Sequence, residues 1–168
     1  MTIVLGSAVK GFALKEALKA HLTEAGHTIV DVGCYDTTRF VTYTSVGERL
    51  AAELQRDPAA LGISCCGSGT GAALAAGKFR GVLACSCESE LTARLIRVVN
   101  NANCLCMGEQ VVTPDLACRM ADAFVNATFL DAPGIPGNVL AFWKEAHDEM
   151  AARGPEAAPR DLESPRPA

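Results

Sequence analysis

The stretch LGISCCGSGTGAALAAG, from Leu61 to Gly77, decides the fold. Residues 61–66 form a short, mostly apolar run, which is typical of a strand buried on both faces of a parallel sheet. A glycine-rich turn follows at once, and residues 70–76 have the composition of a helix that opens directly after it. A strand, a tight turn and a helix in this order predict one βα unit.

The same alternation continues on both sides of this unit. We expect further strands at residues 2–6, 27–32, 81–85 and 104–107, and further helices at residues 11–25, 44–55, 89–99 and 114–126, the last begun by Thr113 and Pro114. Five βα units need helices on both faces of one sheet. The predicted fold is a three-layer α/β/α sandwich, Rossmann-like and doubly wound around a five-stranded parallel sheet, with its ligand beyond the carboxyl ends of the strands.

The pattern breaks at DAPGIPGN, residues 131–138, and a last helix is expected at about residues 139–150. Leu140, Trp143 and His147 share one face of this helix, which can pack on its own core or dock on a neighbouring subunit. We expect residues 1–152 to form a single domain. Residues 153–168 contain four prolines and no apolar period, so they are expected to be a disordered tail.

Composition narrows the class of ligand and the compartment. The net charge of the 168 residues is −4 and no basic block is present, which argues against nucleic acid and anionic membranes as partners and favours a small molecule. The N-terminus reaches polar and glycine residues after four apolar positions, so we expect neither a signal peptide nor a membrane span, and a cytoplasmic protein.

The eight cysteines lie mostly within apolar runs, which favours reduced thiols over disulfides. The pairs Cys85/Cys87 and Cys104/Cys106 have the spacing of one strand face, and core packing is the favoured interpretation over a metal site.

Cys66 stands at the junction of the predicted strand and its glycine-rich turn. Alternating glycines let a backbone turn tightly and direct several N–H groups at one point, which stabilises an oxyanion. A thiol placed there can serve as a base or a nucleophile. The run lacks the Lys-Ser/Thr ending of a phosphate-binding Walker loop and the spacing of a dinucleotide loop.

Residues 66–81, CGSGTGAALAAGKFRG, closely resemble the C-G-T-G-x-G-x-x-x-A-A-N-K-x-x-G signature of the ribose 5-phosphate isomerase B and galactose 6-phosphate isomerase family. DVGCYDTTR, residues 31–39, is similar to that family's second strand and active-site loop. NNANCLCMGEQVV, residues 100–112, is similar to its N-x-x-N-V-x-x-x-G segment. The resemblance runs from about Ile3 to Met150 and implies an aldose–ketose isomerase that works through a cis-enediolate.

The resemblance implies a role for each matching residue. Cys66 would move the proton between C1 and C2, with Ser68 beside it as a second catalytic residue. Substrate-binding residues are expected to be Gly67, Gly69, Thr70, Gly71, Tyr43, Asn100, Arg39, Arg97 and Ser7. No metal and no cofactor are expected, because a base and an oxyanion cradle suffice for enediolate chemistry.

The chain departs from the family at several active-site positions. Ser7-Ala8 replaces an Asp-His pair, Val99 a His and Gln110 an Arg, and residues 131–138 replace an Arg-containing segment. The resemblance assigns ring opening to the His and phosphate binding to the arginines.

Three hypotheses follow from these departures. The chain is an active isomerase for an altered substrate, such as a four-carbon or open-chain sugar; or one subunit of a heteromer whose homologous partner supplies the missing groups; or a non-catalytic sugar-binding protein. By resemblance a homo-oligomer, a dimer or tetramer with sites at subunit interfaces, is expected.

Overall fold

All five strands of the computed structural model, which describes residues 1–153, lie in one parallel sheet. The strands are β1 (Thr2–Ser7), β2 (Thr28–Asp31), β3 (Leu61–Cys66), β4 (Ala84–Ser86) and β5 (Cys104–Gly108). Their order is β2-β1-β3-β5-β4, and every neighbouring pair is parallel. β3 is therefore the central strand, as expected for a run buried on both faces.

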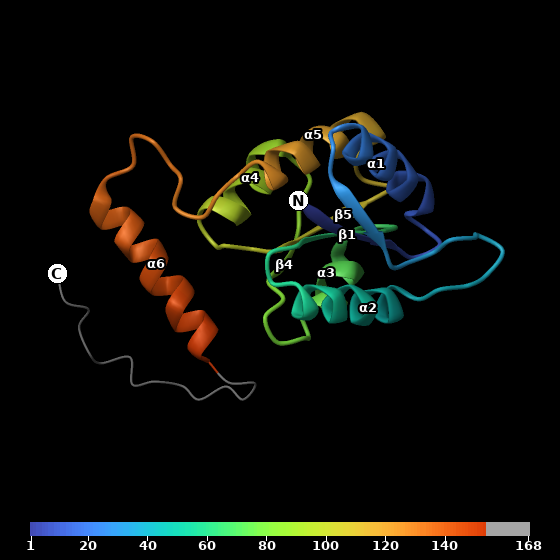
Figure 1. The fold of residues 1–168 in the computed structure, drawn as a ribbon, viewed down its shortest axis with the longest axis horizontal. Coiled ribbons are helices and arrows are strands. Elements are labelled where there is room, and N and C mark those ends of the chain that lie inside the picture. Colours follow the sequence, from blue (N-terminus) through green and yellow to red (C-terminus); the bar gives the residue numbers. More distant parts are fainter. Residues whose placement is uncertain (154–168) are drawn as a thin grey trace.

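Helices cover both faces of the sheet, which confirms the predicted three-layer sandwich (Figure 1). One face carries α1 (Phe12–Glu24), α4 (Glu90–Val98) and α5 (Pro114–Val125), and the other carries α2 (Tyr43–Arg56) and α3 (Thr70–Ala76). The side chain of Thr113 accepts the amide of Leu116 and Pro114 opens α5, as the sequence predicted.

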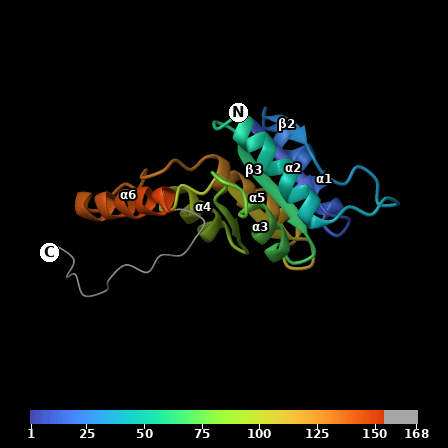
Figure 2. The ribbon, with the colours of Figure 1, turned by 90° about the horizontal axis from the view of Figure 1, so that it is seen from below.

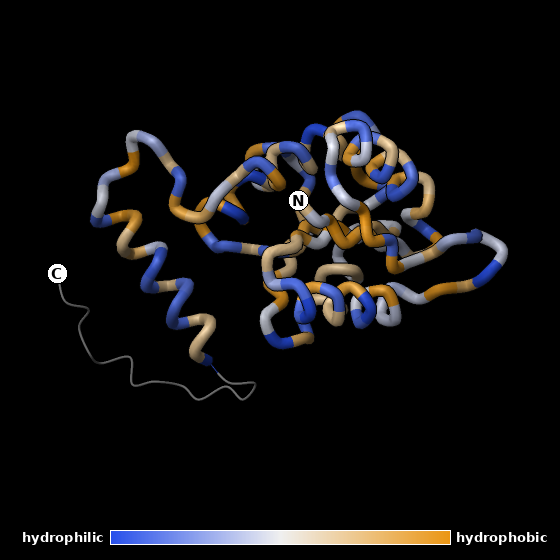
Figure 3. Tube along the Cα trace, in the orientation of Figure 1, coloured by the Kyte–Doolittle hydropathy of each residue, from blue (hydrophilic) through white to orange (hydrophobic). Residues whose placement is uncertain are grey.

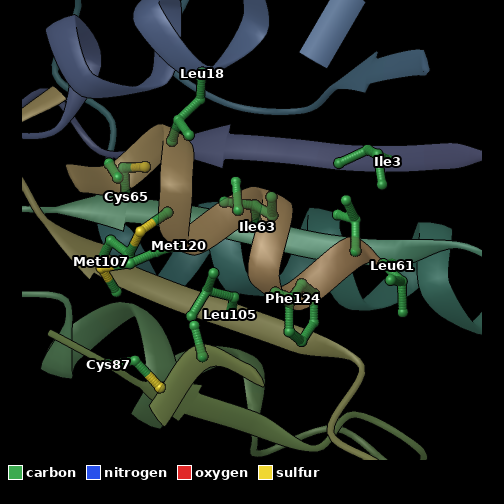
Figure 4. Close-up of a cluster of buried hydrophobic side chains, with 14 of the residues drawn as sticks. Ile3, Leu18, Leu61, Ile63, Cys65, Cys87, Leu105, Met107, Met120 and Phe124 are labelled. Atoms are coloured by element: carbon green, nitrogen blue, oxygen red, sulfur yellow. The ribbon is translucent and has the colours of Figure 1, made fainter. Parts of the chain in front are cut away.

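Two hydrophobic cores lie on the two faces, because successive side chains of a strand point in opposite directions. Ile63 and Cys65 of β3 belong to the core under α1 and α5, together with Phe124 (Figure 4). Cys66 belongs to the core under α2 and α3. The central strands are drawn mostly in the hydrophobic colour in Figure 3.

The two cysteine pairs pack in these cores. Cys104 and Cys106 are fully buried in the core under α2 and α3, with their Sγ atoms 3.8 Å apart. Cys87 is buried in the opposite core, and Cys85 packs against that core. The interpretation as packing residues is confirmed.

The fourth strand begins later than predicted. The expected strand covered residues 81–85, whereas β4 is Ala84–Ser86. Asn103 Nδ2 donates to the Gly81 carbonyl at 2.8 Å, and Asn103 Oδ1 accepts the Leu83 amide at 2.9 Å. A side chain therefore satisfies backbone groups that a longer ladder would have paired.

The last helix, α6 (Gly137–Ala152), stands away from the sandwich (Figures 1 and 2). None of its residues is buried, and its face with Leu140, Trp143 and His147 is half-buried. His147 stacks on Phe129 with ring centroids 5.0 Å apart and lies 3.5 Å from the Asn101 amide. The tail predicted at 153–168 lies, except for Arg153, outside the described residues.

Lys15 of α1 is a fully buried cation that ties this helix to the end of β2. Its Nζ lies 2.7 Å from Asp31 Oδ2 and 2.8 Å from Glu16 Oε1. Burial alone lowers the pKa of Lys15, but the hydrogen bonds that its ammonium donates to Asp31 and Glu16, together with the charges of these carboxylates, outweigh burial, so the net shift is upward. The ion pair between Lys15 and Asp31 fixes the position of Asp31, where the long loop from β2 to α2 begins.

Asp31→Ala is therefore expected to lower the free energy of unfolding by about 3–5 kcal/mol, because it leaves the Lys15 charge buried without its main partner. Glu16, whose side chain is 43% exposed, provides the control, and Glu16→Ala should cost less than about 1 kcal/mol. Urea denaturation at pH 7 measures both. Equal midpoints for the two variants would contradict this account of Lys15.

Candidate active site

Cys66 ends the central strand on the face opposite to Cys65, because successive side chains of a strand alternate between the two faces. Cys65 is fully buried, and burial raises the pKa of its thiol far above the ordinary value. Cys66 retains 6% of its surface in contact with solvent. Of these two adjacent residues, only Cys66 retains any exposed surface.

The loop after Cys66 directs an amide at the thiol. The Gly69 N–H donates to Cys66 Sγ at 3.1 Å. Gly69 has φ +83°, and a Cβ added there would lie 2.7 Å from Ser86 Oγ at the end of β4. Only glycine fits this position without displacing its neighbours.

The end of β5 holds the loop from the other side. The Glu109 N–H donates to the Cys66 carbonyl at 2.9 Å, and the Gln110 N–H donates to the Gly67 carbonyl at 3.0 Å. A Cβ added at Gly108 would lie 2.5 Å from the Ser68 carbonyl carbon, so the two backbones are in direct contact. The Ser68 amide has no backbone acceptor among residues 1–153.

Several predicted site residues gather around this loop. Ser68 and Thr70 are exposed, and their hydroxyl oxygens are 2.7 Å apart. Tyr43, the first residue of α2, lays its ring against Gly71, where an added Cβ would lie 3.3 Å from the ring. Arg39 is exposed on the loop that leaves the carboxyl end of β2, so it lies at the same edge of the sheet.

Ser7 does not join them. It is fully buried on the face of Cys65, its partner in the ladder between β1 and β3. Its hydroxyl has no hydrogen-bond partner among the described residues. A ligand at Cys66 therefore cannot contact the Ser7 side chain in this conformation, which corrects the expectation that it binds substrate.

Asn100 and Arg97 lie at the opposite edge of the sheet. α4 runs back from the carboxyl end of β4, so Asn100 comes just before the start of β5. The six residues of β3 rise about 3.3 Å each, which separates the two edges by roughly 17–20 Å. One chain does not bring Asn100 or Arg97 to its own Cys66.

The edge of the sheet at the amino ends of the strands, here called the amino edge, also borders a cavity. A cavity of about 1080 Å³ lies there between the sandwich and the end of α6, lined in part by Arg97, Asn101, Lys78, Arg80 and His147. Arg97 donates to Asn101 Oδ1 at 3.1 Å and to the Ala102 carbonyl at 2.9 Å. Its Nε is buried without a partner among the described residues.

Sequence reasoning missed Ser86 and Glu109 as neighbours of the loop. Both follow from one signal, since each lies at or just after the carboxyl end of a strand. Glu109 follows β5, which neighbours the central strand, and Ser86 ends β4, the edge strand beyond β5. The Glu109 carboxylate accepts the Leu14 amide in the first turn of α1 at 3.3 Å, so it also joins this helix to the site.

Within residues 1–153, no group of three or more His, Cys, Asp and Glu side chains is arranged to hold a metal ion. The same part of the chain contains no helix with the length and apolar character needed to cross a membrane.

Comparisons with known proteins agree with this geometry. Residues 3–134 match the family described as Ribose/Galactose Isomerase. A relative named 4-deoxy-4-sulfo-D-erythrose isomerase, from Clostridium sp. (strain MSTE9), is 35% identical over 131 residues, which cover 78% of this chain and 82% of the relative. Ribose-5-phosphate isomerase B of Mycolicibacterium paratuberculosis is 35% identical over 156 residues, 92% of this chain and 98% of that protein.

A solved structure extends the likeness to the fold. Ribose-5-phosphate isomerase B from Mycoplasma genitalium, with bound ribulose-5-phosphate, superposes with a TM-score of 0.77 at 29% identity, covering 90% of this chain and 97% of that one. The sequence match over residues 3–134, the shared sandwich and the Cys66 loop lead to one conclusion: this chain belongs to the ribose/galactose isomerase family of aldose–ketose isomerases.

Proposed function

We propose that the chain interconverts a small aldose and its ketose through a cis-enediolate, with Cys66 as the base that moves the proton. The observation that carries this proposal is the Gly69 amide 3.1 Å from Cys66 Sγ, at the mouth of a loop whose backbone is pinned by β5. The Gly69 N–H fixes the position of the sulfur, and the remaining loop amides are available to the substrate oxygen.

The proton balance is simple. The Cys66 thiolate removes the hydrogen on C2 of the aldose, and the electron pair moves through C1–C2 to the carbonyl oxygen, which gives the enediolate. The Cys66 thiol then returns the proton to C1, while the oxygen on C2 loses its proton to become the ketone. The hydroxyls of Ser68 and Thr70, 2.7 Å apart, can carry the proton that passes between the two substrate oxygens.

A four-carbon substrate fits the departures from the family. A four-carbon sugar substituted at C4 cannot close a furanose ring through that position, so it needs no ring-opening histidine. His21 pairs with Asp122 at 2.8 Å, His27 precedes β2, and His147 lies on α6, so no described histidine lies at the carboxyl edge. The similarity to a protein named for a sulfonated erythrose supports the same choice.

The complete site is proposed to form between two copies of this chain. Asn100 and Arg97 lie at the amino edge, and α6 makes few contacts with its own sandwich while exposing Phe142 and Met150. A second copy that covers α6 would place the carboxyl edge of one subunit against the amino edge of the other. A homodimer of this kind brings Asn100 to the sugar hydroxyls at the partner's thiol.

The proposed location is the cytoplasm. All eight cysteines are free thiols, and at least five of them lie in the two cores. A reducing compartment suits such a protein.

The adjacent thiols test the base. Cys66→Ala is expected to lower turnover by about 10²–10⁴-fold, because a positioned acid–base group is lost, with little change in melting temperature. Cys65→Ala should keep its activity and cost about 1 kcal/mol of stability as a small buried group. Turnover of D-erythrose 4-phosphate and thermal unfolding measure both effects. Full activity in Cys66→Ala would show that the base lies elsewhere.

Subunit mixing tests the shared site. Cys66→Ala and Asn100→Ala homodimers are each expected to be weakly active, whereas a mixture that has exchanged subunits should recover up to about a quarter of wild-type turnover, because each hybrid dimer contains one intact site. Co-purification through a tag on one variant verifies the exchange. Hybrids that form without any recovery would contradict a site shared between subunits.

A further inference from the structure

Lys10 lies beside the catalytic loop because of the turn that follows β1. The next residue, Gly11, has φ +121°, and a Cβ added there would lie 2.6 Å from the Cys65 carbonyl carbon and 2.8 Å from the Cys66 amide nitrogen. This close approach seats the turn directly on the peptide bond between the two cysteines. Lys10 itself is exposed at the carboxyl edge.

Lys10 and Gln110 flank Gly67. A Cβ added at Gly67 would lie 3.2 Å from Gln110 Oε1 and 3.8 Å from Lys10 Cβ. Gln110 is neutral, so Lys10 supplies the positive charge on this side of the loop. The flexible stem of a lysine extends about 5 Å from Cβ to Nζ, which lets the ammonium reach over Gly67.

The described part of the chain leaves the ammonium of Lys10 without a carboxylate partner. Lys15, Lys19 and Lys144 each form an ion pair with a carboxylate, at 2.5–3.0 Å. Lys10 forms none among residues 1–153. The Glu109 carboxylate accepts the Leu14 amide at 3.3 Å. An unpaired cation next to a base and an oxyanion cradle is suited to a substrate anion.

We propose that Lys10 binds the anionic group at the far end of the substrate and thereby selects a short sugar that carries a phosphate or sulfonate at C4. This inference rests on the proposed function. With C1 and C2 held at Cys66, the C4 substituent of a tetrose lies two carbons away, within reach of a lysine whose stem starts beside Gly67. A longer sugar phosphate would carry its charge past this position.

Lys10→Met is expected to raise KM about 10- to 100-fold for both D-erythrose 4-phosphate and 4-deoxy-4-sulfo-D-erythrose, the loss typical of one charge-assisted hydrogen bond, with kcat nearly unchanged. Lys10→Arg should restore most of the lost affinity. Arg119→Met is the matched control, because it removes one charge from an exposed side chain of α5 that pairs with Glu90 and Asp115.

Calorimetry with 4-phospho-D-erythronate separates this inference from the proposed function, since binding does not require turnover. Wild-type binding that weakens at least 10-fold in Lys10→Met, but not in Arg119→Met, supports Lys10 even if no sugar is isomerised. Equal affinities and equal KM values in wild type and Lys10→Met would overturn the inference while leaving Cys66 catalysis intact. In that case the charge must come from elsewhere, such as Arg97 at the amino edge of a second copy.

Discussion

Direct backbone contact between the end of β5 and the loop after β3 is the constraint on which the rest of the site depends. The amides of Glu109 and Gln110 hold the carbonyls of Cys66 and Gly67, and Gly108 touches Ser68 with no room for a side chain. Gly11 presses on the same loop from the side of β1. A loop held from two neighbouring strands cannot reorient easily, so the amide that faces Cys66 Sγ is in place before any substrate arrives.

Much of this arrangement could be predicted from the sequence. The glycine spacing after residues 61–66 predicted the turn, and the apolar run of residues 61–66 predicted a strand buried on both faces. The start of β4 could not be predicted, because it depends on where the Asn103 side chain lies. The burial of Ser7 likewise depends on which face of β1 meets α1 at the strand end.

The placement of Asn100 shows a different limit. The family motif associated Asn100 with Cys66 at the carboxyl ends of the strands. α4 runs antiparallel to the strands, however, so it ends at their amino ends, and Asn100 lies there. Motif matching does not say which chain supplies a residue. The topology does, and together with an α6 that has no buried residue it favours a site built from two subunits.

The changes around Cys66 form a consistent set. Gln110 is neutral, no described histidine lies at the carboxyl edge, and Lys10 is an unpaired cation close to Gly67. Retaining the thiol and the amide cradle while changing the groups around them suits the same proton transfer on a different sugar. The altered groups are those that would open a sugar ring and bind the substrate anion. The retained groups are those that would form and stabilise the enediolate.

A crystal structure of the complex with 3-phospho-D-glycerohydroxamate, whose planar hydroxamate resembles the enediolate of a four-carbon sugar phosphate, tests the central claim that the Cys66 loop is the site of chemistry. The account predicts hydroxamate oxygens about 2.7–3.1 Å from amides of residues 67–71, with the adjoining carbon facing Cys66 Sγ. A ligand bound without contact to residues 66–71, for example in the cavity beside α6, would contradict it.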